Sequence, residues 1–311
     1  VTGPIIPTPG AVMECTKLLY EYLGDLIVLD VGGATTDLHS VTVESDQVAR
    51  LMISPEPKAK RTVEGDLGVY VNRWKVVESI GEEKLREQCR EQGFSMEHAL
   101  ETYRAIPKTE EEVKLVELLT REAVVKAAER HAGRLRYIYG PSGRSTVAEG
   151  KDLTQVKYIV GTGGALTRLP HREEIMREIT RCNESGMLLL PGEHAQILVD
   201  HDYIMASLGV LSKRYPQAAA RLLEQSLGIT FPERKAEEPV PVCNKELSRL
   251  ETQRQQREEE LRRHIEECEA MGYDMSAYRE NKPKAGDCSH ECSRCTRLHC
   301  PNRITQEGAS S

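Results

Sequence analysis

The residues best suited to chemistry are an aspartate, two glycines and two threonines that lie within seven consecutive positions. They are Asp30, Gly32, Gly33, Thr35 and Thr36. The backbone amides of a glycine turn form a concavity that binds anions, and a carboxylate beside it can help to hold magnesium. An ordinary glycine hairpin is the alternative, but it does not account for an acidic residue on each side of the turn or for the two threonines inside it. We therefore expect a phosphate-binding turn.

A second glycine turn follows much later in the chain. Gly161, Gly163 and Gly164 come after a short aliphatic stretch at 157–160, which we expect to form a strand. Glycine allows a positive φ angle where a strand turns into a helix. A turn of this kind can serve the fold, a ligand or both.

Four cysteines near the end of the chain have the spacing of a metal site. Cys288, Cys292, Cys295 and Cys300 follow the pattern C-x3-C-x2-C-x4-C-P. Four thiolates within thirteen residues can enclose zinc or ligate an iron–sulfur cluster. The first three match the C-x3-C-x2-C of radical-SAM enzymes, but those enzymes need a long barrel downstream and only eleven residues follow Cys300. The spacing favours a metal site over free thiols.

Several stretches carry a resemblance to a known family. DVGGATTD at 30–37 resembles the second phosphate motif of the actin/hexokinase/DnaK-type ATPase superfamily. VGTGGALTRLP at 160–170 is similar to its adenosine motif, and PTPGAVME at 7–14 lies where its first connecting helix begins. With RTVEGDLGV at 61–69 and EGKDLTQVKYIVGTGG at 149–164, they resemble the MutL-type accessory proteins of adenosylcobalamin-dependent glutamate mutase. That family is unrelated to the mismatch-repair protein of the same name, and the resemblance covers residues 1–215.

The resemblance implies a role for each residue of the two turns. Asp30 would orient magnesium through water, and the amides and hydroxyls of residues 32–36 would hold phosphate. Gly161, Gly163 and Gly164 would let the backbone approach the adenosine and the α-phosphate. ATP and Mg²⁺ are therefore the expected cofactors, and the subunits of a cobalamin-dependent mutase are the expected partners.

Two departures from the superfamily pattern bear on catalysis. The superfamily needs a first phosphate motif in an N-terminal half-domain, and this chain has none. Because the chain begins with Val1 in what reads as mid-domain sequence, we expect it to be the C-terminal part of a longer protein. DnaK-type relatives have a glutamate just before the proline of the first connecting segment, where this chain has Ile6, which cannot act as a general base. We therefore expect ATP hydrolysis only from the full-length protein.

A sheet and its covering helices must position these residues. Hydrophobic patterning predicts strands at 26–29, 37–43, 48–53 and 157–160, and a hairpin or loop at 137–149. It predicts helices at 10–22, 68–80, 82–92, 95–105, 110–132 and 202–214. The helix at 110–132 is the best defined, because Thr109 and Glu112 have the spacing of a capping box. The expected fold class is α/β, and the resemblance narrows it to the ribonuclease-H-like half of an actin-like ATPase.

The sequence changes character after Phe231. We expect a nucleotide-binding half-domain with a helical insertion at 1–232, followed by a charged linker with two prolines at 233–243. A charged helical arm at 244–272 and a Cys-rich tail at 273–311 should follow. The helix has i,i+4 pairs such as Glu259 and Arg263, but its segment 251–260 contains no apolar residue, which excludes a continuous coiled-coil seam.

Composition limits the class of protein. Of the 311 residues 39% are hydrophobic and 29% charged, and a net charge of −7 argues against a nucleic-acid partner. No apolar run approaches the ~20 residues that span a bilayer, so no membrane association is expected. Nine cysteines without a secretory signal favour a reducing compartment, and we expect a cytoplasmic protein. The cysteines outside the tail read as ordinary buried or free thiols, and His131 and His171 as surface or capping histidines.

The expected function is that of an ATP-dependent accessory factor, chaperone-like, which reactivates a cobalamin mutase such as glutamate mutase. Closure around ATP could favour one of two mutase conformations and so release damaged cofactor. The alternative is a non-hydrolysing nucleotide-binding scaffold whose tail recruits a redox partner or a mutase subunit. A sugar- or acid-kinase relative is a third possibility, but no segment specifies a small phosphoryl acceptor.

Overall fold

The computed structural model of the chain describes residues 6–140, 143–183 and 185–232, together with five helical residues of the C-terminal part, Glu259, Arg263, Glu266, Glu267 and Ala270. The chain divides into two compact units, Val1–Arg234 and Lys235–Ser311. The expected linker and most of the expected charged helix lie outside the described residues. So does the whole Cys-rich tail, with its predicted metal ligands Cys288, Cys292, Cys295 and Cys300.

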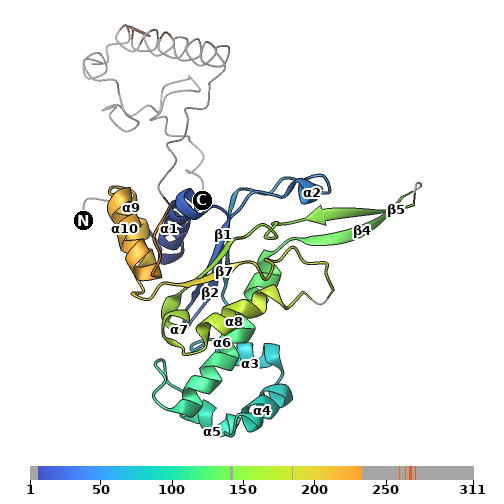
Figure 1. Cartoon of the computed structure of the whole chain (residues 1–311), viewed down its shortest axis with the longest axis vertical. Coiled ribbons are helices and arrows are strands. Elements are labelled where there is room, and N and C mark those ends of the chain that lie inside the picture. The colour runs from blue at the N-terminus through green and yellow to red at the C-terminus, as the bar shows by residue number, and fades with distance from the viewer. Residues whose placement is uncertain are drawn as a thin grey trace. The chain divides into compact units, whose positions relative to one another are not determined.

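A five-stranded mixed sheet forms the centre of the first unit (Figure 1), which confirms the α/β class. Its strands, in order across the sheet, are β3 (Ala59–Glu64), β2 (Thr36–Val41), β1 (Leu26–Val31), β6 (Tyr158–Thr162) and β7 (Gln196–Val199). β2 pairs antiparallel with both β1 and β3, whereas β6 pairs parallel with both β1 and β7. Because β1 and β6 run in the same direction, their carboxyl ends meet at one edge of the sheet. Both predicted glycine turns begin at that edge.

The central strand β1 divides its apolar side chains between two cores, because successive residues of a strand point to opposite faces. Ile27 and Leu29 join the core on one face, which is covered by α6 (Glu110–His131), α7 (Gly163–Arg168), α8 (Arg172–Arg177) and the 3₁₀ turn Glu178–Thr180. Leu26 and Val28 join the core on the other face, which is covered by α1 (Thr8–Leu23), α9 (Met205–Ser212) and α10 (Pro216–Leu227). A strand buried on both faces explains the unbroken aliphatic run in the sequence.

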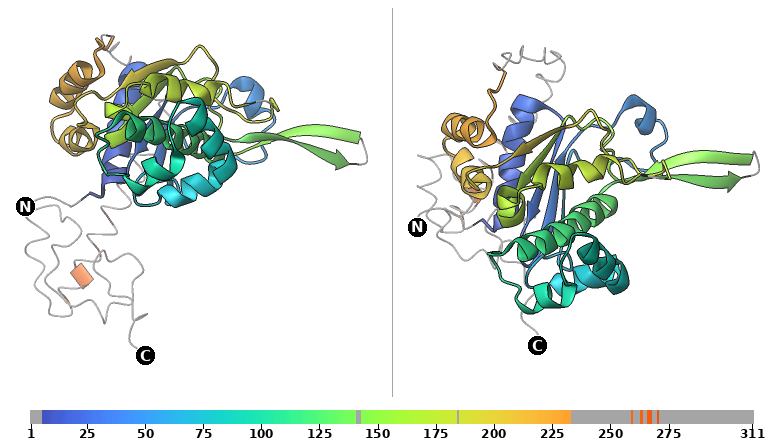
Figure 2. Two further views of the ribbon diagram at one scale, coloured as in Figure 1. Left: turned by 90° about the horizontal axis from the view of Figure 1, so that it is seen from below. Right: turned by 60° about the horizontal axis from the view of Figure 1, so that its bottom comes forward.

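Two insertions extend from this body (Figures 1 and 2). Between β3 and α6 the chain forms three short helices, α3 (Arg73–Ile80), α4 (Glu82–Glu91) and α5 (Met96–Glu101). Between α6 and β6 it forms an antiparallel hairpin of β4 (Arg134–Gly140) and β5 (Gly143–Glu149), which projects from the body in all three views. The hairpin predicted from the sequence is therefore confirmed.

The long helix α6 has the start that its sequence predicts. The Thr109 hydroxyl accepts a hydrogen bond from the Glu112 amide, and the Glu112 carboxylate accepts one from the Thr109 amide, which completes a capping box. None of the helices that the structure describes is both long and apolar enough to cross a membrane.

The strand predicted at 48–53 is wrong. This region forms the short helix α2 (Asp46–Ala49) and a turn, because the Ser45 hydroxyl caps the helix by accepting the Val48 amide. Only Met52 makes an isolated bridge, to Ala148. The third strand on that side of the sheet is β3, which had not been predicted. It lies at the edge of the sheet and none of its residues is fully buried, so it carries little apolar signal.

Two predicted helices begin later than their sequences suggest. The helix predicted from Gly68 begins at Arg73, because the preceding residues make backbone hydrogen bonds to the first glycine turn. The helix predicted from Asp202 begins at Met205, because the carboxylate of Asp200 accepts the amides of the residues at its start.

Candidate functional site

The first glycine turn joins β1 to β2 at the carboxyl edge of the sheet. The Gly32 amide donates to the Thr35 carbonyl at 2.9 Å, which closes the loop. Among the described residues, the backbone amides of Gly33, Ala34 and Thr35 have no acceptor, and all three residues are at least partly exposed. Three accessible and unpaired amides in one tight loop form the kind of concavity that binds an anion.

A second segment, residues 67–72, packs against this turn and binds its carbonyls; we call this segment the brace. The amides of Tyr70 and Val71 both donate to the Gly33 carbonyl, at 2.9 and 2.6 Å. Gly68 packs so closely that a Cβ there would lie 2.2 Å from the carbonyl carbon of Ala34. Backbone hydrogen bonds from the brace hold the turn in place, so the turn keeps its shape without a ligand.

The two threonines of the turn differ in their surroundings. Thr36 is fully buried, and its hydroxyl donates to the Leu67 carbonyl at 2.7 Å, which ties the turn to its brace. Thr35 is partly exposed, and its hydroxyl interacts with the Asp37 carboxylate. Thr35 is thus the threonine within reach of a ligand, and Thr36 supports the loop.

The two glycine turns meet, although they lie more than a hundred residues apart in the chain. Gly163 follows β6 with a φ angle of +87°, and a Cβ on it would lie 2.6 Å from Oδ1 of Asp30 and 2.5 Å from the carbonyl oxygen of Val31. No larger residue fits between the second turn and the Asp30 carboxylate. The structure therefore brings Asp30, Gly32, Gly33 and Gly163 together at one place.

The other two glycines of the second turn differ in their surroundings. Gly161 is buried on the α6 side of the sheet, where a Cβ would lie 2.6 Å from Sδ of Met176, so its small size allows α8 to pack on β6. Gly164 is exposed, and a Cβ there would meet no atom within 4 Å. Of the three, Gly161 is explained by packing within the protein and Gly164 is open to a ligand.

Acidic side chains form a row across the strands at this edge. Asp30 on β1 lies opposite Asp37 on β2 and opposite Thr162 on β6, and the Thr162 hydroxyl donates to the Asp200 carboxylate at 2.8 Å. Burial, followed by the charges of Asp37 and Asp200, raises the pKa of Asp30 to about 6. Burial also raises the pKa of Asp37, whose Oδ1 has no hydrogen-bond partner among the described residues. Such crowding of carboxylates favours a bound cation.

Asp200 is a site residue that the sequence interpretation missed. It is fully buried, and its carboxylate accepts hydrogen bonds from Thr162, from the amides of Ile204 and Met205 at the start of α9, and from the Ser226 hydroxyl on α10. One side chain therefore holds two helices against the strand that leads into the second turn. No short motif in the sequence marks it, because its partners are distributed over 65 positions from 162 to 226.

Tyr203 was missed as well. Its φ angle of +55° is unusual for a residue with a side chain, and 52% of its surface is exposed. Burial of its hydroxyl, and then the charges of Asp30 and Asp200, raise the pKa of Tyr203, which places the hydroxyl beside the acidic row. A left-handed backbone at a tyrosine has no signature in the sequence.

Comparison with known proteins identifies the family of the chain. A family model described as MutL protein matches residues 1–227. The chain belongs to the MutL protein family. "Protein MutL" of Clostridium tetanomorphum is 35% identical over 239 residues, which are 73% of this chain and 52% of that protein. The chain thus spans about half the length of this curated relative. The resemblance that the sequence motifs indicated is confirmed.

Other polar residues of this MutL-family chain form hydrogen bonds or ion pairs with side chains of the same fold. Glu64 and Asp66, from the RTVEGDLGV stretch that carries part of the resemblance, both bind the Arg130 guanidinium at 2.7 Å. His131 was expected to be a surface or capping histidine, but it is fully buried between the hydroxyls of Ser40 and Thr62, at 2.8 and 2.9 Å. That expectation is wrong, because the end of α6 packs onto β2 and β3.

The described thiols outside the tail follow the sequence interpretation, and so does His171. Cys15 and Cys89 are buried and Cys182 is half-buried, and all three are free. His171 is exposed and contacts the Glu117 carboxylate at 3.0 Å. Within the described residues, no group of three or more His, Cys, Asp or Glu side chains has the geometry of a metal site.

Proposed function

We propose that this chain is the nucleotide-binding part of an accessory protein that uses ATP to reactivate a cobalamin-dependent mutase, such as glutamate mutase. The contact between Gly163 and the Asp30 carboxylate carries the proposal. It brings the two motifs that resemble a phosphate motif and an adenosine motif to a single edge of the sheet. One nucleotide could touch both only in such an arrangement.

The residues at this edge have the chemistry that ATP and Mg²⁺ require. The free amides of Gly33, Ala34 and Thr35 would hold phosphate oxygens. Asp30 would hold hydrated magnesium, because carboxylate oxygen is a ligand that Mg²⁺ prefers and because a cation would stabilise the ionised form of a carboxyl with a raised pKa. Gly164 leaves room for the nucleotide beside α7. Bound ATP would supply the free energy with which the protein changes its affinity for the mutase.

The sheet supports the actin-like half-domain as the fold. Three strands pair antiparallel in the order β3, β2, β1, and β6 and β7 then extend the sheet in parallel. This is the arrangement expected of a ribonuclease-H-like half-domain. In such a half-domain the ligand lies at the carboxyl edge of the central strands, in agreement with the rule for open α/β sheets.

The proposed role follows from the chemistry of the cofactor. An adenosylcobalamin mutase that loses its radical partner keeps an inactive corrinoid, and a factor that favours an open mutase conformation would release it. Such a factor must bind the two conformations with different affinity, and ATP can supply that difference only if it changes the factor's shape. Membership of the MutL family supports this role.

Calorimetric titration of the full-length protein with Mg-ATP tests the proposal. Asp30→Ala should weaken magnesium-dependent binding at least about tenfold while the protein stays folded, because the group that holds the cation is lost. Asp66→Ala is the matched control, since the Asp66 carboxylate binds Arg130 and takes no part in the contact between Gly163 and Asp30. Equal affinity of wild type and Asp30→Ala would overturn the nucleotide site.

A non-hydrolysing scaffold is the second candidate, and Ile6 favours it. DnaK-type relatives have a glutamate at this position, and isoleucine cannot accept a proton from water. Steady release of phosphate by the full-length protein would favour the ATPase, and tight ATP binding without turnover would favour the scaffold.

A further inference from the structure

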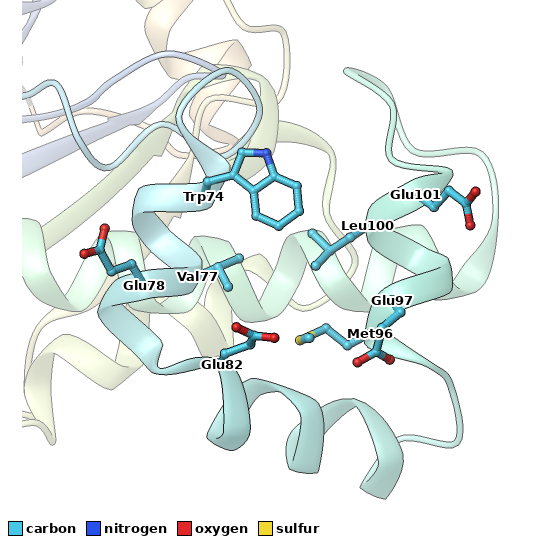
Figure 3. Close-up of a pocket in the computed structure, with 8 residues that line it drawn as sticks. All are labelled: Trp74, Val77, Glu78, Glu82, Met96, Glu97, Leu100 and Glu101. Atoms are coloured by element: carbon cyan, nitrogen blue, oxygen red, sulfur yellow. The ribbon is translucent and has the colours of Figure 1, made fainter.

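An apolar groove lies in the helical insertion, away from the glycine turns (Figure 3). We call it the α3–α5 groove. Its volume is about 650 Å³, and its apolar lining consists of Trp74, Val77, Met96 and Leu100. Trp74 is 55% exposed, so a large aromatic face is open to solvent. Exposed aromatic surface that lines a hollow is typical of a site where another molecule docks.

The rim of the groove is acidic. It carries four glutamates, Glu78, Glu82, Glu97 and Glu101 (Figure 3). Arg86 binds both Glu82 and Glu97, and Lys75 binds Glu78, so two cations face four carboxylates. Glu101 has no ion pair among the described residues. The groove is therefore suited to an apolar segment that carries positive charge.

The projecting hairpin carries exposed apolar residues and a positive charge near its end. Tyr137, Ile138 and Tyr139 near the end of β4 are 49%, 51% and 78% exposed, and Arg144 on β5 stacks on the Tyr137 ring at 4.5 Å. We call these four residues the hairpin tip. A two-stranded ribbon without further packing is only marginally stable in water. Three large exposed side chains in succession indicate that the tip is covered by a partner.

We propose that the hairpin tip of one copy of this chain docks in the α3–α5 groove of a second copy. Aromatic and aliphatic side chains of the tip would cover Trp74 and Leu100, and Arg144 would meet the acidic rim. The hairpin cannot reach the groove of its own chain, because in every view it points away from α3, α4 and α5 (Figures 1 and 2). Two copies that exchange hairpins form a closed dimer, and exchange with successive copies forms a longer assembly.

The protein contains its own reporter for this contact. Trp74 is the single tryptophan among the 311 residues and lines the groove. As the concentration of the chain rises, its emission should shift to shorter wavelength, because the docked tip excludes water from the indole. Sedimentation equilibrium on the same samples should show association over the same range of concentration. Added salt should weaken the association, because opposite charges attract across the contact.

Two variants remove one surface each. Ile138→Glu/Tyr139→Glu places negative charge on the tip, which the acidic rim repels, and Glu78→Lys/Glu101→Lys reverses charge on the rim; all four side chains are exposed, so the fold should be kept. Each variant alone should associate at least about tenfold more weakly than wild type. Val210→Lys is the matched control, since Val210 is 48% exposed on α9 and belongs to neither surface. It should associate like wild type.

Mixing the two variants gives the decisive result. The tip variant keeps an intact groove and the rim variant keeps an intact tip, so one proper contact can form between them. The mixture should therefore recover the shift of Trp74 emission that neither variant shows alone. If wild type stays monomeric up to millimolar concentration, or if the mixture shows no more association than its components, the proposal is wrong. Loss of association in Val210→Lys would also overturn it, because the contact would then lie elsewhere.

Discussion

At the scale of single residues, Asp30 is in a position where its charge lowers the stability of the folded chain. Its pKa rises from 3.8 to about 6 on folding, through burial and the charges of Asp37 and Asp200. Between these two pH values the folded chain binds more protons than the unfolded chain. Stability therefore falls as the pH rises through this window, and above pH 6 the full cost of about 3 kcal/mol is present. A cation bound beside the carboxylate would offset this cost.

Replacement of Asp30 by its uncharged isostere should reveal this cost. We predict that Asp30→Asn unfolds in urea with up to about 3 kcal/mol more stability than wild type at pH 8, and with nearly equal stability at pH 4, where the wild-type carboxyl is already protonated. Asp66→Asn is a control of opposite sign, because Arg130 lowers the pKa of Asp66. This variant should have a lower free energy of unfolding than wild type at pH 8. An equal gain for Asp30→Asn at both pH values would show that packing, and not charge, is responsible.

The sequence could reveal some of these residues and not others. Asp30 and the glycines around it stand in two short motifs, so their types and spacing can be recognised before the fold is known. Asp200 and Tyr203 cannot, because Asp200 acts through hydrogen bonds from β6, α9 and α10 and Tyr203 through a backbone angle. Thr36 illustrates a further limit. Its neighbour Thr35 has the same side chain, and only the brace behind the turn decides which hydroxyl is buried.

At the scale of elements, the segment 67–72 decides the shape of the first glycine turn. It was predicted to begin a helix. In the structure its amides donate to the carbonyls of Gly32 and Gly33, and these long-range hydrogen bonds outweigh local helix propensity. The error at 48–53 has a local cause. An apolar run gave a strand signal, but a capping serine starts the short helix Asp46–Ala49, and a turn follows it.

Gly68→Ala should therefore disturb the nucleotide site from outside it. A Cβ at this position would lie 2.2 Å from backbone atoms of Ala34, so the brace and the turn must separate. We predict a loss of Mg-ATP affinity of at least about tenfold and a loss of stability of about 2 kcal/mol, as expected for overpacking of a rigid contact. Calorimetry and urea unfolding measure the two effects.

Gly65→Ala is the matched control, because it makes the same change three residues earlier in the chain, just before the segment. A Cβ there would meet no atom within 4 Å, and the residue has no positive φ angle. This variant should bind Mg-ATP like wild type. If both variants lost affinity equally, the cause would be the flexibility of the segment and not the close contact of Gly68 with the turn.

At the scale of the whole molecule, the sequence indicated an α/β unit that ends near Phe231, with two glycine turns in it. It could not indicate the order of the strands, because the chain leaves the sheet twice, for the α3–α6 insertion and for the β4–β5 hairpin, before β6 returns beside β1. The groove and the hairpin tip could not be predicted from the sequence either. Trp74 in the groove and the three apolar residues of the tip are exposed, and in a sequence such residues look the same as buried ones.

The C-terminal tail offers the last prediction at this scale. Cys288, Cys292, Cys295 and Cys300 lie beyond a linker that contains two prolines, in a stretch too short to build a core of its own. Metal binding can order such a stretch, because the free energy of binding then drives its folding. We predict that protein purified without oxygen contains zinc or iron, as elemental analysis would show. Cys292→Ser/Cys295→Ser should lose the metal.

The control for this variant uses cysteines of the same chain outside the tail. Cys89→Ser/Cys182→Ser removes the same number of thiols from the first unit, Val1–Arg234, and should keep the metal. Both variants should bind Mg-ATP like wild type, since the residues proposed to hold the nucleotide all lie between 30 and 164. Wild-type protein free of both metals would mean that the tail cysteines are ordinary thiols, and the redox-partner role would then lose its support. If loss of the metal also abolished ATP binding, the tail would belong to the nucleotide-binding unit, and the boundary near Phe231 would be wrong.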